Sequence, residues 1–209
     1  MIRIAVVGGI GSGKTYAAKL FGFPVFNADE EVSKIYKRNK SVYKKLKIKL
    51  PDFVFSFPIK KKEISNAVKS NTKNLNLISS IVHPVVRKNM YKFLKKNKKR
   101  KAIILDIPLY FENKLNKKKD IVIFISTKKK LINKALKKRN KSNIKLLKKL
   151  ERLQQSLKIK KKKSVYVIIN DFKSENLKKK IKIIKKEILN GKRGNSRHWD
   201  DRLRCKRWT

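Results

Sequence analysis

A run of closely spaced glycines behind a short, mainly apolar segment is the feature that most constrains the fold of this chain. Residues 8–15 are Gly-Gly-Ile-Gly-Ser-Gly-Lys-Thr, which matches the spacing G-x-x-x-x-G-K-[ST]. Residues 2–7 before it predict a buried strand, and residues 16–21 after it have helical spacing. Glycine permits positive φ and close backbone approach, so the N–H groups of such a loop can point at phosphate oxygens. The three pieces together predict a nucleoside triphosphate site.

The residues of this loop have separate predicted tasks. We expect the nucleotide to contact Gly9, Gly11, Ser12, Gly13, Lys14, Thr15 and Tyr16. The helix that begins near Gly13 adds the positive end of its dipole. Lys14 can reach the outer phosphates, and the Thr15 hydroxyl can bind Mg²⁺. Four of the seven glycines in the chain fall within residues 8–13, which favours this interpretation over a ligand-free turn between strand and helix.

Length and composition predict a single α/β domain with an insertion or a small subdomain, in a chain of 209 residues. No apolar run approaches the ~20 residues that a membrane-spanning helix needs. Cys205 is the only cysteine, so neither an internal disulfide nor a zinc cluster can form. We therefore expect a cytoplasmic protein without a membrane partner.

The net charge of +46 has two possible explanations. Dense lysine is typical of nucleic-acid binding, because it neutralises phosphates without regard to sequence. However, lysine outnumbers arginine by 49 to 11, and asparagine and isoleucine are also abundant, as A/T-rich codons would produce. The lysine runs are scattered along the chain and are not gathered into one tract. We favour the compositional explanation and expect small anionic substrates, which such a field attracts.

Carboxylates are scarce, so the acids that follow predicted strands are informative. Asp29 comes after residues 23–26, at the end of a strand where ligands of open α/β sheets bind. It could cap the next helix, or it could accept a proton from a substrate hydroxyl. Asp106 ends the apolar strand 102–106, which resembles a Walker B strand whose Asp holds Mg²⁺. Glu112 is a second carboxylate in the turn that follows.

Strands alternating with helices predict a parallel sheet. The expected strands are residues 2–7, 23–26, 102–106, 121–125 and 165–169. The expected helices are short ones within 38–74, a longer one from Leu75 to Met90, one over 131–138, a polar segment over 140–163, and a terminal one carrying Leu177, Ile181, Ile184 and Ile188. Pro84 should bend or restart the helix from Leu75, because proline lacks an N–H. His83 beside it could be structural or functional.

The motifs together resemble the dephospho-coenzyme A kinase family over residues 1 to about 190. The resemblance rests on four segments: the loop 8–15, Asn27-Ala28-Asp29, His83-Pro84-Val85-Val86-Arg87, and Asp106-Ile107-Pro108-Leu109-Tyr110-Phe111-Glu112. Gln154 and Lys160 have the family's spacing before the last strand, and Asn170 follows that strand. Residues 191–209 differ in composition, and we interpret them as a tail outside the fold.

The resemblance implies a P-loop NTPase fold, with a five-stranded parallel sheet flanked by helices, a helical substrate-binding region near 30–95 and a lid near 139–163. It implies that ATP phosphorylates the ribose 3′-hydroxyl of dephospho-CoA, with Asp29 activating that hydroxyl and Arg139 stabilising phosphate charge. Lys14 would hold the transferring phosphate, and Thr15 and Asp106 would hold Mg²⁺. The implied substrate-binding residues are Asp29, His83, Arg87, Pro108, Leu109 and Glu112. We expect a monomer.

The sequence also departs from the family pattern. Asn27 replaces an Asp, and Tyr16 stands where a small hydroxyl residue is common. In the lid, the family's usual residues are replaced by Leu150, Ser156 and Lys158, with Arg152 near the position where an Arg is expected. Two rival functions stay open: another P-loop kinase acting on a nucleoside or nucleotide, and an ATP-dependent nucleic-acid-binding protein.

Overall fold

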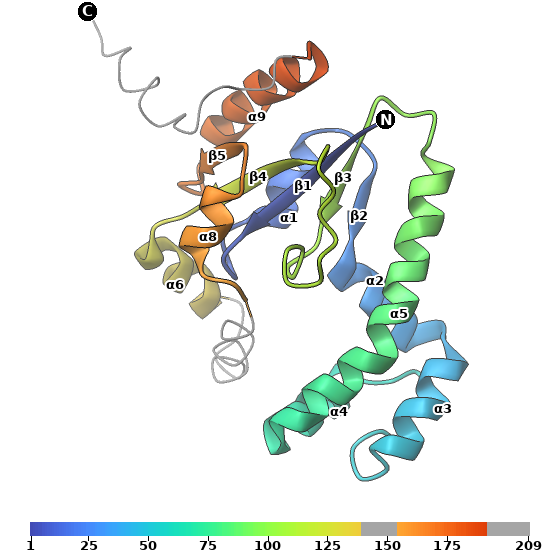
Figure 1. Ribbon diagram of the computed structural model, residues 1–209. Helices are drawn as coiled ribbons and strands as arrows, with labels where there is room; N and C mark the ends of the chain where they lie inside the picture. The colour runs from blue at the N-terminus through green and yellow to red at the C-terminus, as the bar shows by residue number, and fades with distance from the viewer. Residues whose placement is uncertain (139–153, 192–209) are drawn as a thin grey trace, which may run out of the picture. The chain divides into compact units, whose positions relative to one another are not determined.

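The computed structural model describes residues 1–138 and 154–191, which form two compact units (Figure 1). A sheet unit consists of Met1–Phe26 and the described residues from Lys99 onward. A helical unit consists of Asn27–Lys98. Arg139, Leu150 and Arg152, and the predicted tail from residue 192 onward, lie outside the described residues.

A five-stranded parallel sheet with the order β2-β3-β1-β4-β5 organises the sheet unit, as predicted. The strands are β1 (Ile2–Gly8), β2 (Val25–Asn27), β3 (Ala102–Asp106), β4 (Ile121–Ser126) and β5 (Tyr166–Ile169). β1 lies in the middle, between β3 and β4, and Val6 is in register with Asp106. The carboxyl ends of β1, β3, β4 and β5 therefore meet at one edge of the sheet, where ligands of such folds bind.

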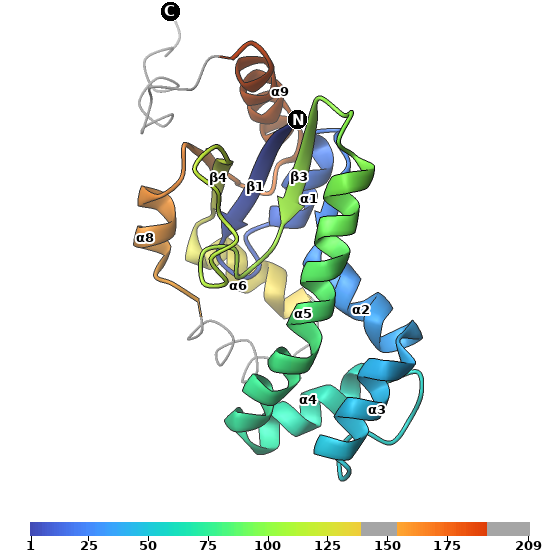
Figure 2. The ribbon, with the colours of Figure 1, turned by 45° about the vertical axis from the view of Figure 1, so that its right-hand side comes forward.

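The two faces of β1 are buried by different elements, so its residues are apolar on both sides. Ile4 and Val6 belong to the core that includes α1 (Lys14–Leu20) and α9 (Ser174–Leu189). α8 (Leu157–Lys162) contacts β1 and lies on the opposite side of the sheet (Figures 1 and 2). The apolar face of α9, predicted from its spacing, is buried against the strands. α6 (Lys129–Lys138) follows β4.

The turn between β3 and β4 is held by a buried polar group. The Tyr110 hydroxyl donates a hydrogen bond to the Asp120 carboxylate, which also forms an ion pair with Arg3 at 3.1 Å. Burial and this hydrogen bond raise the pKa of Tyr110 above its ordinary value. Tyr110 therefore stays neutral and anchors the turn that carries Glu112.

Four helices form the helical unit, and α5 packs against the other three. They are α2 (Ala28–Arg38), α3 (Lys40–Lys49), α4 (Lys61–Ser70) and α5 (Thr72–Lys96), and Figure 2 shows α5 as the longest. The prediction of short helices within residues 38–74 is confirmed. No helix in the described part of the chain has the length and the hydropathy required to cross a membrane.

The prediction that the helix restarts at Pro84 is wrong, because α5 continues through it. Pro84 cannot donate a hydrogen bond to the carbonyl of Ser80, one turn earlier. Both residues are exposed, so the missing bond falls on the solvent side of the helix, where water can replace it. The buried side, with Ile78 and Val82, keeps its packing.

Two predicted boundaries also differ. β2 begins at Val25, two residues later than expected, although the Pro24 carbonyl already accepts a hydrogen bond from Ile104 N–H at 2.9 Å. In the described part of the polar segment predicted as helical over 140–163, the helix is confined to α8. Ser156 caps it by accepting a hydrogen bond from Ile159 N–H, which explains why the helix starts there.

Candidate functional site

The glycine loop occupies the turn between β1 and α1, and two of its glycines cannot be replaced without strain. Gly13 is the N-cap of α1 and has φ 88°, and a Cβ on it would lie 2.4 Å from Asn170 Nδ2. A Cβ on Gly8 would lie 2.5 Å from the carbonyl oxygen of Ile125. Both distances are far below an ordinary contact, so the close approach of loop and neighbouring strands requires glycine.

The Ser12 carbonyl of the loop is fixed from the ends of two neighbouring strands. Thr127, after β4, donates its hydroxyl to this oxygen at 3.1 Å. Asn170, after β5 and 2% exposed, donates its side-chain N–H to the same oxygen at 2.9 Å. Asn170 N–H itself donates to the Ser126 carbonyl at 2.8 Å. The Ser12 carbonyl is therefore held by side chains that follow two strands of the sheet.

The predicted metal ligands are adjacent. The Thr15 hydroxyl, in the first turn of α1, donates a hydrogen bond of 2.6 Å to Asp106 Oδ2. Asp106 ends β3 and is 3% exposed. A hydroxyl and a carboxylate are the oxygen ligands that Mg²⁺ prefers, and one or two protein oxygens are what a nucleotide-bound Mg²⁺ uses. Lys14 Nζ donates to the Gly9 carbonyl at 2.7 Å, so the lysine lies along the loop.

A buried lysine connects the turn after β3 to α8. Lys160 is 0% exposed, and its Nζ lies 2.9 Å from Glu112 Oε1. The same nitrogen donates to the Pro108 carbonyl and to Gln154 Oε1, each at 3.2 Å. The ammonium group thus has three acceptors, which offset the cost of removing its charge from water.

Glu112 also joins this cluster to the segment before α8. Its Oε1 accepts a hydrogen bond from Gln155 N–H at 2.7 Å. Within the described residues, neither Glu112 Oε2 nor Gln155 Oε1 has a hydrogen-bond partner, although both atoms are buried. Buried acceptors of this kind are costly unless a donor reaches them. Glu112 therefore keeps one oxygen for a further donor.

In the helical unit, the structure separates the two roles considered for Asp29. Asn27 is the N-cap of α2, and its side-chain oxygen accepts a hydrogen bond from Glu30 N–H at 2.8 Å. Asp29 lies inside the first turn of the helix and is exposed. The interpretation of Asp29 as the cap is wrong, because Asn27 performs that task. The proton-acceptor role is not tested by this geometry.

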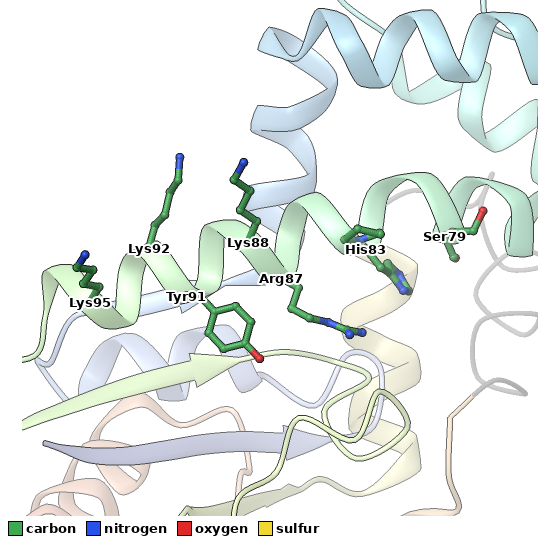
Figure 3. Close-up of a pocket in the computed structure, with 9 residues that line it drawn as sticks. Ser79, His83, Arg87, Lys88, Tyr91, Lys92 and Lys95 are labelled. Atoms are coloured by element: carbon green, nitrogen blue, oxygen red, sulfur yellow. The ribbon is translucent and has the colours of Figure 1, made fainter.

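A surface pocket of about 750 Å³ opens along α5. Its lining includes His83, Arg87 and Tyr91 together with Lys88, Lys92 and Lys95. Figure 3 shows that Arg87 and Tyr91 point to one side of α5, and Lys88 and Lys92 to the other. Burial and the Arg87 charge lower the pKa of His83 below its ordinary value of 6.5. The pocket thus combines a neutral imidazole with several cations.

Some of the residues that shape the site are not part of the predicted set. Thr127 and Asn170 act through one backbone carbonyl, and Lys160 acts through Glu112 and Pro108. The position of Asn170 directly after a predicted strand is a signal that could have indicated its place at the loop. For Lys160, which begins a run of four lysines, the composition gives no signal, and only its family spacing before the last strand singles it out.

A glycine loop between the central strand and a helix, with Thr15 bonded to a carboxylate on the adjacent strand, defines the chain as a P-loop nucleotide-binding protein. The model of the dephospho-CoA kinase family matches residues 2–176. The chain therefore belongs to the dephospho-CoA kinase family.

Individual relatives agree with this assignment. The dephospho-CoA kinase of Fusobacterium nucleatum is 34% identical over 184 residues, covering 85% of this chain and 94% of that protein. The one from Agrobacterium fabrum is 34% identical over 131 residues, which span 60% of this chain and 66% of its own length. Thus the chain spans slightly less than two thirds of the length of some curated relatives, and nearly all of another.

Solved structures show the same fold. TT1252 from Thermus thermophilus superposes with a TM-score of 0.72 at 25% identity, over 90% of this chain and 97% of that one. The dephospho-CoA kinase of Campylobacter jejuni gives a TM-score of 0.62 at 24% identity, over 90% of this chain and 98% of that one. These similarities confirm the predicted P-loop architecture.

Proposed function

We propose that this protein transfers the γ-phosphoryl group of ATP to the ribose 3′-hydroxyl of dephospho-CoA, which yields CoA and ADP. The observation that carries the proposal is the family match over residues 2–176, in a chain whose phosphate loop and Thr15–Asp106 pair are intact. The transition state of phosphoryl transfer is loose, so positioning and charge supply most of the catalysis.

The loop residues supply most of that positioning. The first N–H groups of α1 lie at the positive end of the helix dipole and bind phosphate oxygens. Lys14 exchanges its bond to the Gly9 carbonyl for a bond to the outer phosphates. Thr15 and Asp106 hold Mg²⁺, which neutralises phosphate charge when it is bound. Asn170 and Thr127 bind the Ser12 carbonyl and so help to hold the loop in place for the phosphates.

Asp29 is the proposed general base, and it orients and deprotonates the attacking hydroxyl. Two arguments support this role: the resemblance to the family implies it, and the helix cap is Asn27 and not Asp29. Arg139 is the proposed cation over the transferring phosphoryl group, on its position in the sequence alone. Lys14 completes the proposed catalytic set.

The pocket on α5 is the proposed binding surface for the acceptor. His83 and Arg87 line it, and its three lysines suit a substrate that carries a diphosphate. Pro108, Leu109 and Glu112, in the turn after β3, are the other proposed contacts. The free Glu112 oxygen suits a hydroxyl or amide donor of the acceptor.

The setting of the reaction stays a prediction. We propose that the protein works as a cytoplasmic monomer on small molecules and that nucleic acid is not a partner. Its charge of +46 then serves only to attract anionic substrates. A rival kinase that phosphorylates a nucleoside or a nucleotide would use the same loop, so the acceptor must be tested directly.

An acceptor panel tests the proposal. ADP release is measured with dephospho-CoA, with nucleosides, with nucleoside monophosphates and with RNA. We expect turnover with dephospho-CoA and none above background with the others. Lys14→Ala should abolish the signal and leave the fold intact, because Lys14 is not part of the buried core. Preferred turnover with a nucleotide, or stimulation by RNA, would replace the proposal with one of its rivals.

A further inference from the structure

We infer that the ring of Phe172 is the surface on which the nucleobase of the phosphate donor stacks, and that this residue sets the affinity for ATP. The inference rests on the proposed function, because it concerns the same nucleotide. It starts from an unusual backbone conformation beside the phosphate loop.

Phe172 has φ 63°, in the left-handed region. Within residues 1–138 and 154–191, Lys114 is the only other non-glycine residue with positive φ. Glycine or asparagine would adopt this conformation at much lower cost than a residue with a bulky side chain. An aromatic residue at this position therefore works against the local backbone preference, which points to a task for its ring.

The loop around Phe172 is fixed on both sides. Phe172 N–H donates to Asn170 Oδ1 at 3.0 Å, and the other end of that amide binds the Ser12 carbonyl of the phosphate loop. Two residues further on, the Ser174 hydroxyl shares a 2.6 Å hydrogen bond with the Tyr16 hydroxyl. Both bridges join the β5–α9 loop to α1 or to the loop before it. Phe172 is thus held at a set position relative to the phosphate site.

The ring lies next to the end of the phosphate loop and yet faces solvent. Its Cε1 would be 3.8 Å from a Cβ placed on Gly13, the N-cap of α1. Phe172 is nevertheless 44% exposed. A core residue would be covered, and a residue that only shields the loop would not need a rigid left-handed turn. The exposed ring face is available to a flat ligand.

The nucleobase of the phosphate donor, ATP, is a flat ring system that suits the exposed ring face of Phe172. A nucleotide whose phosphates lie on the N–H groups of Lys14 to Tyr16 extends its sugar and base beyond the start of α1. Phe172 lies beside the N-terminus of α1, and aromatic rings stack on every kind of nucleobase. Stacking gives affinity with little discrimination between bases, so we expect ATP to be bound more tightly than tripolyphosphate and only modestly better than GTP.

Steady-state kinetics test the inference with matched variants. Phe172→Gly removes the ring and relaxes the backbone, so it separates the ring from the strained turn. Phe172→Tyr keeps the aromatic face. We expect Phe172→Gly to raise the KM for ATP by about 10-fold or more, the usual worth of one base–aromatic stack. Its kcat and its KM for dephospho-CoA should stay within about twofold of wild type, and Phe172→Tyr should resemble wild type.

A binding measurement keeps the test independent of the acceptor. Trp199 and Trp208, the only tryptophans, are replaced by phenylalanine, and Phe172→Trp then provides a single reporter. ATP should quench its fluorescence, and tripolyphosphate at saturation should not. Equal KM values for ATP in wild type and Phe172→Gly, or no quenching by ATP, would overturn the inference. If wild type binds ATP with quenching but does not phosphorylate dephospho-CoA, the proposed function fails and the inference stands.

Discussion

Asn27 and Asp29 occupy different positions at the start of α2. The Asn27 side chain satisfies the N–H of Glu30, and Asp29 occupies the following turn without acting as the cap. A cap and a first-turn acid are both common at helix N-termini, so the sequence could not distinguish them. The position of one hydrogen bond does so, and it assigns the cap to Asn27.

Asp29→Asn should therefore separate catalysis from stability. Loss of a positioned base should lower kcat by on the order of 10²-fold or more. The free energy of unfolding should fall by less than about 1 kcal/mol, the worth of one acid near a helix N-terminus. Asn27→Ala, which removes the cap, should instead cost about 1 kcal/mol and leave most of the activity. Wild-type turnover in folded Asp29→Asn would remove Asp29 from the mechanism.

The Thr15 hydroxyl should be required for metal use. Thr15→Val keeps the branched shape and removes the oxygen that is bonded to Asp106. We expect the Mg²⁺ concentration for half-maximal turnover to rise at least about 10-fold. Loss of a hydrogen-bond partner of a metal ligand already lowers metal affinity by about this factor. Thr15→Ser, which retains the hydroxyl, should stay near wild type. An unchanged Mg²⁺ requirement in Thr15→Val would exclude Thr15 as a ligand.

At the scale of elements, the Lys160–Glu112 pair joins α8 to the turn after β3. Both side chains are largely buried, with exposed fractions of 1% and 13%. Lys160→Met leaves the carboxylate without its partner and should lower the free energy of unfolding by about 3 kcal/mol, as seen for broken buried pairs. The double variant Lys160→Met/Glu112→Gln should recover much of this loss. Urea titrations measure both, and a loss below about 1 kcal/mol in the single variant would contradict this account.

Several element-level features could be predicted from the sequence and others could not. The strands follow from their apolar runs, because a parallel sheet buries both faces. Lys160 could not be recognised as buried, because its run of lysines resembles a solvated face. The continuity of α5 through Pro84 depends on which side of the helix faces solvent. The apolar spacing around the proline did not show which side this is. The proposed role of Phe172 could be inferred only from the backbone geometry, because the positive φ of this residue is not visible in the sequence.

His83 on α5 should make stability depend on pH. Its pKa is lowered in the folded protein, so the folded state binds this proton less tightly than the unfolded chain. Stability should therefore fall as the pH drops below 6.5, and this loss should level off below the folded pKa. His83→Gln should lose less stability than wild type between pH 7.5 and pH 5.5, as measured by urea midpoints. Equal losses would contradict the predicted sign.

At the scale of the whole molecule, function depends on a few groups in a chain dominated by lysine. The loop motif predicted the nucleotide site because its spacing constrains the backbone. The motif can be recognised even in a chain with this lysine-rich composition. The net charge of +46 is compatible with a nucleic-acid partner and with small anionic substrates, so the charge by itself did not distinguish between them. The family was predicted from several motifs together, and the match of the family model to residues 2–176 confirmed this prediction.

The central claim is that phosphate moves from ATP to the 3′-hydroxyl of dephospho-CoA, and ³¹P NMR of the reaction mixture tests it most directly. With protein, Mg²⁺, ATP and dephospho-CoA, the account predicts that the γ-phosphate signal disappears while a new phosphomonoester signal of CoA appears in equal amount. Without dephospho-CoA, the ATP signals should persist. Release of inorganic phosphate alone, with no new ester signal, would contradict the account.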